Sequence, residues 1–284
     1  MGKTELSLRI AEALGSPILN CDSRQIFKEL KIGTASPTQE QLNRVQHYFV
    51  GSQSIHDSYN AGKYECDAIA LLETLFERND SILMTGGSML YIDAVCKGID
   101  DMPDINPDLR AALVQQHLTE GLEGILEELE RLDPVYFSQV DKKNHKRVLH
   151  GLEVCRQTGA TFSSFRKEKV KERPFTIRKI CLNRDRKELY ERIDQRVLNM
   201  MEQGLEAEAK SLLPFKHLNA LKTVGYKELF DFFEGKCTLE AAVSNIQFNT
   251  HNYARKQLTW FRKDTGYSWF HPDEIDKIFD YLIL

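Results

Sequence analysis

Two short segments near the amino terminus carry side chains suited to group transfer. An apolar run that begins at Ile18 ends abruptly at Asp22, and Gly2-Lys3-Thr4 lies upstream of it. A short apolar run that polar residues end is typical of a buried parallel strand, and ligands of open α/β sheets lie beyond the carboxyl ends of such strands. Gly-Lys-Thr before a helical run matches the second half of a phosphate-binding loop, although the tripeptide alone is weak evidence. Phosphate on one side and a carboxylate on the other favour a transfer site.

A glycine-rich turn supplies a further candidate. The run Ser81–Thr85 is apolar enough for another buried strand, and Gly86-Gly87-Ser88 interrupts it just before a helical segment at Met89. Glycine permits close backbone approach, and a helix amino terminus beside a serine hydroxyl can meet an anion or an oxygen-bearing substrate. Ser88 is therefore a second candidate for the reacting site.

Positive charge gathers in segments, although the formal net charge of the chain is −4. This charge argues against a uniformly basic nucleic-acid binder and leaves room for local patches. Basic runs occur at 142–147 and 166–173, and a basic face interleaved with aromatic residues occurs within 242–262. A single charged run is more often a solvated helix face, whereas two such runs in one helical module favour contact with a phosphate backbone.

Two arginines on one predicted helix leave a choice open. Arg192 and Arg196 are four residues apart, so they lie on the same flank. They could form surface ion pairs with Glu188 or Glu191, or they could form an arginine fork for a diphosphate. The composition of the helix does not decide between the two.

The elements that must position these groups follow an α/β pattern. Apolar runs predict strands near 18–21, 47–51, 81–85, 175–182 and 266–270, and helical periodicity predicts long helices at 186–213 and 242–262. Between about 100 and 173 only helices are expected, at 109–118, 122–132 and 146–158. We therefore predict an α/β core with a parallel sheet, made of 1–100 and 174–284, and a helical insertion at 101–173.

Size and composition bound the protein class. The chain has 284 residues, 42% of them apolar, which is enough to bury a full core in roughly two domains. Neither a membrane-spanning run nor a secretory leader is expected from the sequence. Six scattered cysteines without a CxxC pair argue against a zinc or dithiol site and are expected to be reduced thiols, which favours the cytoplasm.

A series of segments, in order and spanning nearly the whole chain, carries a family resemblance. They are Gly2–Thr4, Asp22–Phe27, Ile32–Ala35, Gly86–Tyr91, Leu152–Val154, Arg192–Val197, Val224–Glu228 and Tyr253–Phe261. Together they resemble the tRNA dimethylallyltransferases, also called tRNA isopentenyltransferases. The resemblance implies a P-loop NTPase-like parallel sheet core flanked by helices and an inserted all-helical domain, 101–173, that binds tRNA. It also implies transfer of a dimethylallyl group from dimethylallyl diphosphate to N6 of the adenine on the 3′ side of the anticodon.

The resemblance assigns catalytic and diphosphate-binding roles. Adenine N6 is a weak nucleophile because its lone pair is delocalised, so the Asp22 carboxylate is expected to remove its proton and Ser88 to orient the reacting atoms. The family usually has threonine where this chain has Ser88, and serine keeps the hydroxyl. Departing diphosphate needs amides, cations and Mg²⁺. Gly2, Lys3 and Arg196 are expected to bind the diphosphate, with the Thr4 hydroxyl on the metal side.

The resemblance also assigns the RNA contacts. An adenine stacked in an anticodon loop must turn outward to react. Residues expected to contact the extruded base or its neighbours are Asp22, Ser23, Arg24, Gln25, Ser88, Arg110, Lys146, Arg147, His150, Lys222, Thr223, Val224, Gly225, Tyr226 and Lys227. His150 stands where the family pattern leads us to expect a second arginine, which puts that contact in doubt. The expected partners are tRNA and dimethylallyl diphosphate, without a membrane, and the protein is expected to be a monomer.

One departure concerns the phosphate-binding loop. The first glycine of the loop and the strand before it are not represented in the sequence, which begins at the second half of the motif. In P-loop folds that strand lies inside the sheet, so we expect exposed strand edges and apolar surface. We also expect weak binding of the prenyl donor, which calorimetric titration before and after adding an upstream strand and loop would test.

Two other functions remain open from the sequence. A kinase of small metabolites or nucleotides could use the same Gly-Lys-Thr and strand-end Asp, but it would not explain the basic helical insertion. A catalytically silent RNA-binding protein is the second alternative, because the phosphate loop is incomplete.

Overall fold

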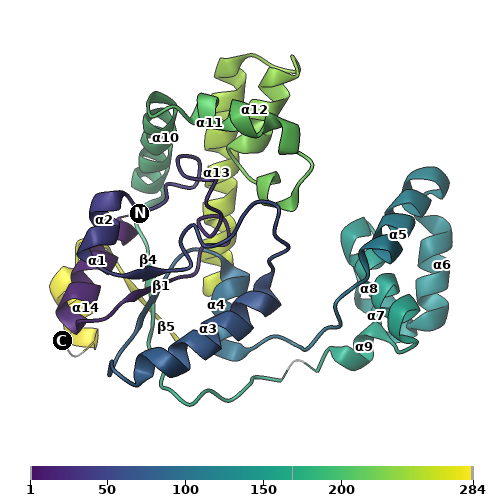
Figure 1. Cartoon of the computed structure of the whole chain (residues 1–284), viewed down its shortest axis with the longest axis horizontal. Coiled ribbons are helices and arrows are strands. Elements are labelled where there is room, and N and C mark those ends of the chain that lie inside the picture. Colours follow the sequence, from purple (N-terminus) through teal and green to yellow (C-terminus); the bar gives the residue numbers. More distant parts are fainter. Residues whose placement is uncertain (1, 168, 283–284) are drawn as a thin grey trace. The chain divides into compact units, whose positions relative to one another are not determined.

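The computed structural model describes residues 2–167 and 169–282. They form two compact units, one made of 2–96 with 173–282 and the other of Lys97–Glu172 (Figure 1). The first unit contains every described strand, and the second is helical. Within the described residues, no helix combines the length and apolar character needed to cross a membrane.

A three-stranded parallel sheet carries the residues around Asp22. The strand β1 (Ile18–Asn20) is flanked by β2 (His47–Tyr48) and β3 (Leu83–Thr85), in the order β2-β1-β3. Ile18 is level with both His47 and Leu83, so the strands end at the same edge. All three β1 residues are buried, as expected for a central strand with both faces covered.

A second parallel pair stands apart from this sheet. It consists of β4 (Lys179–Leu182) and β5 (Tyr267–Phe270), so the strand predicted from residue 175 is shorter than expected. Strands β3 and β4 both line a largely apolar cavity of about 1000 Å³. The described residues pair β3 with β1 and β4 with β5, each on one side only. Two strand edges therefore meet at an apolar cavity.

Helices cover the strands of the first unit. The helix α1 (Lys3–Leu14) packs with α14 (Ile275–Leu282) through Leu6, Ile10 and Ile278. The helices α3 (Ala61–Phe76) and α4 (Met89–Lys97) contribute Tyr64 and Tyr91, whose rings stack at 4.2 Å in the cluster around Leu19. The short helix α2 (Gln39–Arg44) precedes β2. These helices hold the carboxyl edge of the sheet in place.

A separate helical layer forms the largest apolar cluster of this unit. It contains α10 (Arg186–Glu202), α11 (Leu205–Leu212), α12 (Tyr226–Phe233) and α13 (Leu239–Phe261), with short 3₁₀ turns at Leu213–Phe215 and Asn219–Leu221. The single helix predicted over 186–213 is wrong. The chain turns at Gly204, whose φ of 98° is a left-handed conformation that glycine adopts without a steric cost.

The second unit is a helical bundle with its own core. Its helices are α5 (Pro107–Glu120), α6 (Glu123–Leu132), α7 (Pro134–Gln139), α8 (His145–Thr158) and α9 (Phe162–Phe165). Leu113, Ile125, Leu129 and Leu152 are fully buried at its centre. Asp133 is also fully buried and accepts hydrogen bonds from Tyr136 and Ser163, which ties α7 to α9. The unit therefore has the internal contacts of a domain.

Candidate active site

The residues directly after β1 fold back on the Asp22 side chain. Asp22 Oδ1 accepts hydrogen bonds from the backbone N–H groups of Arg24 at 2.9 Å and Gln25 at 3.3 Å. Such an Asx turn is a local preference of Asp, and it fixes the direction of the carboxylate at the end of the strand. Asp22 is half-buried, so its carboxylate stays accessible to a ligand while its turn holds it in place.

The glycines after β3 allow the second strand end to approach the first. A Cβ atom on Gly86 would lie 2.5 Å from the backbone carbonyl carbon of Cys21, and one on Gly87 would lie 2.6 Å from Nε2 of Gln257. At Gly86 only glycine fits, because the nearest atoms belong to the backbone of Cys21, whereas a larger residue at Gly87 would displace the Gln257 side chain. The approach brings Ser88 Oγ to 2.9 Å from Ser23 Oγ and to 2.8 Å from the Ser23 backbone N–H, which donates to it. The predicted site residues Asp22 and Ser88 therefore lie on neighbouring turns, one after β1 and one after β3, which hydrogen bonds between Ser23 and Ser88 connect.

Lys3 belongs to the same cleft. Its Nζ donates to the Gly86 carbonyl at 3.1 Å, and Gly2, with φ of 77°, caps the start of α1. Loss of hydration lowers the pKa of Lys3, and the nearby Asp22 carboxylate opposes that decrease. The same two influences act on Arg196, whose pKa is also lowered. Asp22 and the cations predicted to bind diphosphate therefore lie close enough to interact electrostatically.

Arg24 and Gln25 are held by carbonyl groups of two other loops. Arg24 Nη1 donates to the carbonyls of Asn219 and Ala220, both at 3.2 Å. Gln25 Nε2 donates to the carbonyls of Thr34 at 3.1 Å and Ala35 at 3.0 Å. These bonds connect the turn after β1 to the loop around residue 34 and to the 3₁₀ turn before α12.

The loop around residue 34 is held by one carboxylate. Glu208 on α11 accepts backbone hydrogen bonds from Lys31 at 3.1 Å, Ile32 at 2.9 Å and Gly33 at 3.0 Å, and a fourth from the Tyr226 hydroxyl at 2.7 Å. Gly33 lies so close to Tyr226 that a Cβ there would be 2.7 Å from its ring. Glu208 therefore positions the loop whose carbonyls hold Gln25.

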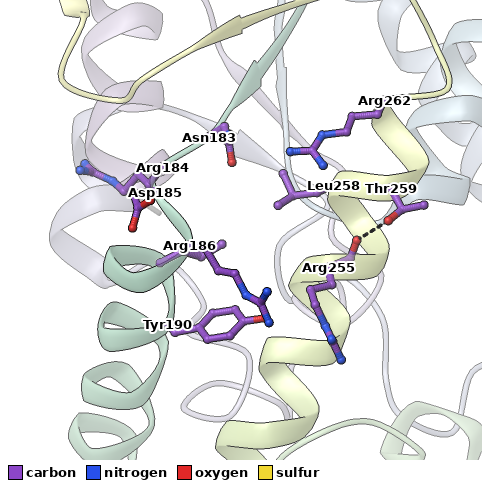
Figure 2. A pocket seen from close by; sticks show the side chains of 10 residues that line it. Asn183, Arg184, Asp185, Arg186, Tyr190, Arg255, Leu258, Thr259 and Arg262 are labelled. Atoms are coloured by element: carbon purple, nitrogen blue, oxygen red, sulfur yellow. Dashed lines mark hydrogen bonds between the residues drawn. The ribbon is translucent and has the colours of Figure 1, made fainter.

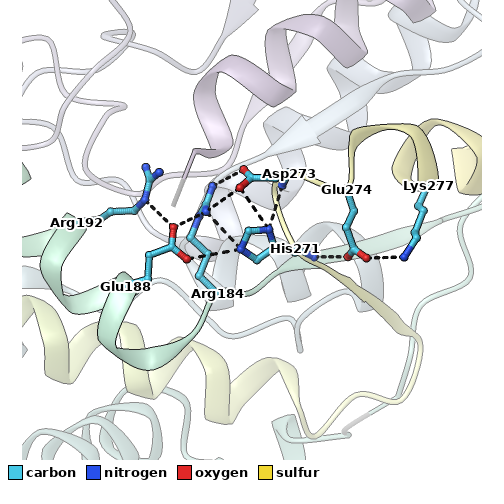
Figure 3. Close-up of polar contacts among 7 residues, drawn as sticks. All are labelled: Arg184, Glu188, Arg192, His271, Asp273, Glu274 and Lys277. Atoms are coloured by element: carbon cyan, nitrogen blue, oxygen red, sulfur yellow. Dashed lines mark hydrogen bonds and ion pairs between the residues drawn. The ribbon is translucent and has the colours of Figure 1, made fainter.

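The side chains of Arg192 and Arg196, both on α10, have different partners. Arg196 Nη2 donates to the Thr34 carbonyl at 3.4 Å, on the side of the cleft. Arg192 Nε instead donates to Glu188 at 3.1 Å, next to the ion pair between Glu188 and the buried Arg184 (Figure 3). The structure thus contains the predicted surface ion pair at Arg192, whereas Arg196 remains the candidate ligand for a phosphate.

Comparison with known proteins supports one family. The family model for IPP transferases matches residues 25–264. The chain belongs to the IPP transferase family. It is 56% identical over 282 residues to tRNA dimethylallyltransferase 2 of Parabacteroides distasonis, covering 99% of this chain and 94% of that protein. The enzyme of the same name from Porphyromonas gingivalis is 58% identical over 277 residues, covering 98% and 92%.

A solved structure agrees with the fold of this family member. The full-length tRNA isopentenylpyrophosphate transferase from Bacillus halodurans superposes with a TM-score of 0.71 at 29% sequence identity, covering 99% of this chain and 92% of that one. The predicted α/β, P-loop-like fold class is therefore confirmed. The family resemblance drawn from the sequence is confirmed as well.

The loop at 222–227 in this IPP transferase presents its two lysines and buries its centre. Lys222 and Lys227 are exposed, Thr223 and Val224 are half-buried, and Gly225 and Tyr226 are buried. The Tyr226 ring is fully enclosed and its hydroxyl donates to Glu208, so this side chain offers no surface to RNA. The Tyr226 side chain therefore packs behind the loop, and contact of the loop with tRNA stays a prediction that rests on its exposed lysines.

A second carboxylate supports the loop at 222–227. Glu228 is buried, and its Oε2 accepts from the Gly225 N–H at 2.8 Å while Oε1 accepts from Asn249 Nδ2 at 2.8 Å. Gly225 has φ of 100°, a conformation that a residue with a side chain rarely adopts. Glu228 thereby fastens the loop to α13 and holds the two lysines at its ends.

The helical unit of this family member contains the four remaining candidates. Arg110 donates through Nε and Nη2 to both oxygens of the buried Glu153, at 3.0 and 2.9 Å. His150 Nδ1 lies 3.4 Å from the same carboxylate. Lys146 and Arg147 are exposed on the first turn of α8. Lys146 and Arg147 thus present free charge, whereas much of the Arg110 charge is compensated within the unit.

Sequence reasoning missed four residues of the site. Tyr253 and Gln257 on α13 both donate to the Gly87 carbonyl, at 3.3 and 2.6 Å, and loss of hydration raises the pKa of Tyr253. Both lie in the Tyr253–Phe261 segment that carries the family resemblance, so their spacing of four on one helix was an available signal. Glu208 carries no local signal, because its partners lie in other segments. Glu228 does have one, since it lies three residues after Gly225, whose N–H it accepts, and it ends the Val224–Glu228 segment of the resemblance.

Proposed function

We propose that this protein transfers the dimethylallyl group of dimethylallyl diphosphate to N6 of the adenine on the 3′ side of the anticodon in tRNA. A bond forms between N6 and the prenyl carbon, and the bond from that carbon to oxygen breaks with its electron pair leaving on diphosphate. The N6 proton passes to Asp22. The observation that carries the proposal is the Asp22 carboxylate in the same cleft as Lys3 and Arg196, in a chain of this family.

The proposed roles follow from the charges of the cleft. A carboxylate at hydrogen-bonding distance assists proton loss from a weak nucleophile. Lys3, the amide groups at the start of α1 and Arg196 would stabilise the charge that grows on diphosphate. Ser88, held against Ser23, would orient the reacting atoms. In this proposal adenine N6 attacks beside the negatively charged Asp22, and diphosphate departs beside the positively charged Lys3 and Arg196.

The residues around the cleft also fit a magnesium ion carried by the substrate. Within the described residues, no three His, Cys, Asp or Glu side chains gather to hold a metal by themselves. Mg²⁺ commonly binds to substrate phosphates with only one or two protein oxygens, and the exposed Thr4 hydroxyl beside Lys3 is such a donor. When bound, the ion would neutralise charge on the leaving diphosphate.

We further propose that the tRNA anticodon stem-loop is the partner of both units. Ser23, Arg24 and Gln25 would contact the extruded adenine, and their bonds to neighbouring loops would fix them before RNA arrives. Lys222 and Lys227 of the first unit, and Lys146 and Arg147 of the second, would neutralise flanking phosphates. The helical unit at 101–173 would thereby serve as the tRNA-binding domain.

A transfer assay tests the proposal. The protein is incubated with undermodified tRNA and radiolabelled dimethylallyl diphosphate, and label is expected in RNA without ATP. Digestion to nucleosides should place the label on one adenosine beside the anticodon. ATP-dependent phosphorylation of a small molecule would support a kinase instead, and tight tRNA binding without label would support a silent binder. An Asp22→Asn variant, matched in size, serves as the control for the chemical step.

A further inference from the structure

A second pocket of the first unit lies beyond the carboxyl end of β4. It has a volume of about 440 Å³ and opens between the start of α10 and the second half of α13 (Figure 2). Its lining is Asn183, Arg184, Asp185, Arg186, Leu189, Tyr190, Arg255, Leu258, Thr259 and Arg262. Four of these ten residues are arginines, in a chain whose net charge is negative.

Three of the four arginines have no acidic partner among the described residues. Arg186, Arg255 and Arg262 form no ion pair there, and all three are exposed. The guanidinium of Arg184 instead points away from the pocket, toward Glu188 and Asp273 (Figure 3). The one carboxylate in the lining, Asp185, accepts from the Lys187 N–H at 2.8 Å as the cap of α10. The pocket therefore carries an excess of positive charge.

Aromatic rings hold two of these arginines over the pocket. The Arg186 guanidinium lies 5.2 Å from the centre of the Tyr190 ring, and that ring stacks on His251 at 4.0 Å. Arg262 lies 5.8 Å from the centre of the Trp269 ring. Stacking on a ring restricts a guanidinium and leaves its N–H groups free to bind oxygen. Less conformational entropy is then lost when an anion binds.

Arg255 and Thr259 of the pocket lie on a different face of α13 from the residues that contact Gly87. Tyr253 and Gln257 face Gly87 across the cleft, whereas Arg255 and Thr259, each two residues further along α13, line the pocket. Residues two apart on an α-helix lie on nearly opposite sides. Arg255 and Thr259 therefore lie on the opposite side of α13 from Tyr253 and Gln257, and Leu258 borders both the pocket and the cavity that Lys3 lines.

We propose that this arginine pocket binds a phosphate group that takes no part in the transfer step. Guanidinium groups bind phosphate oxygens in pairs of parallel hydrogen bonds, and three guanidinium groups line this pocket without an acidic partner among the described residues. The phosphate comes from the backbone of the RNA or from a free phosphate compound. The first source rests on the proposed function, and the second does not.

Paired variants of the 284-residue chain test the proposal. Arg186→Gln/Arg262→Gln removes two charges from the pocket, and Lys187→Gln/Lys263→Gln removes two from the adjacent exposed positions outside it. A third variant, Thr259→Glu, keeps the arginines and introduces a carboxylate that competes with a ligand. Each protein is titrated with inorganic diphosphate by calorimetry, and its affinity for unmodified tRNA is measured across a series of salt concentrations.

The expected results separate the two sources of phosphate. If RNA supplies it, the arginine variant and Thr259→Glu lose about tenfold in tRNA affinity, and the arginine variant lowers the salt slope by about one to two. If a free compound supplies it, the same two variants lose one diphosphate-binding site and keep their affinity for tRNA. If both variants behave like the lysine control in both titrations, the pocket does not bind phosphate. Label transfer by the unmodified chain, followed in parallel, reports separately on the proposed function.

Discussion

The cleft around Asp22 and the arginine pocket are bordered by different residues of α13, and both are rich in cations. The cleft sets Lys3 and Arg196 against a carboxylate that is fixed by its own turn. The pocket sets three arginines beside one carboxylate that is already used as a helix cap. The cleft therefore sets a carboxylate that can accept a proton against its cations, whereas positive charge predominates in the pocket.

This difference separates chemistry from binding. A transfer reaction requires an acceptor for a proton and donors for a leaving anion, so both charges must face the same space. Binding an anion requires only preorganised donors. The cleft is also held by carboxylates behind it, at Glu208 and Glu228, whereas the pocket arginines are held by aromatic rings. The following predictions test whether this contrast is real, in order of decreasing expected effect.

Removing the Asp22 carboxylate should leave the cations of the cleft without their negatively charged neighbour. For Asp22→Asn we expect turnover to fall by about 10²- to 10⁴-fold, because the proton acceptor is lost, with tRNA affinity nearly unchanged. Single-turnover transfer and filter binding measure the two quantities. If the variant loses tRNA affinity but keeps a normal single-turnover rate, Asp22 is a binding residue. The cleft would then differ from the arginine pocket in charge but not in role.

Removing the Glu208 carboxylate, which holds the loop around residue 34, should lower activity in the cleft and leave the arginine pocket unchanged. Glu208→Ala leaves three backbone N–H groups and the Tyr226 hydroxyl without their acceptor, so we expect a loss of about 2 kcal/mol in the free energy of unfolding and about tenfold in kcat/KM. Glu208→Gln should recover part of both losses, because its amide oxygen still accepts. Urea unfolding and steady-state kinetics give the values. If kcat/KM stays normal in the folded alanine variant, Glu208 is only structural.

The two regions should respond differently to pH. The pKa of Lys3 is lowered by burial, so its charge is lost as pH rises through a value below that of free lysine, and diphosphate binding in the cleft should weaken there. Arginine stays charged throughout this range, so Lys3→Arg should remove the decline. Calorimetry with dimethylallyl diphosphate between about pH 7 and pH 10 tests this, given the usual lysine pKa near 10.4. An identical decline in both proteins would assign the titration to another group.

An arginine that already has an acidic partner should matter least. Arg192 pairs with Glu188 on the surface of α10, so Arg192→Gln should change diphosphate affinity by less than about twofold, as exposed pairs contribute little. Arg196→Gln, one helical turn further on, is the matched comparison and should weaken diphosphate binding clearly. Calorimetry measures the diphosphate affinity of both variants. Equal losses of affinity would mean that Arg192 and Arg196 bind the diphosphate together, as an arginine fork.

Local patterns predicted the parts of the site that depend on neighbours in sequence. The turn that fixes Asp22, the strand before it and the glycines at 86 and 87 could be inferred from residue type and spacing. The break of the predicted helix at Gly204 could not, since a single glycine is tolerated within many helices. The different roles of Arg192 and Arg196 could not be inferred either. Both lie on the same flank of the helix, and only their partners differ, Glu188 for Arg192 and the Thr34 carbonyl for Arg196.

The sequence by itself determined the family, the α/β class and the presence of a carboxylate, a lysine and a serine at strand and helix ends. Periodicity and short motifs carry that information, because they act over a few residues. Only the tertiary structure decided that Glu208 holds a loop some 175 residues away, that Tyr226 is buried behind the site, and that α13 contributes residues both to the site around Gly87 and to an arginine pocket. These relations arise where distant segments pack together, and no local pattern encodes the partner that a side chain meets there.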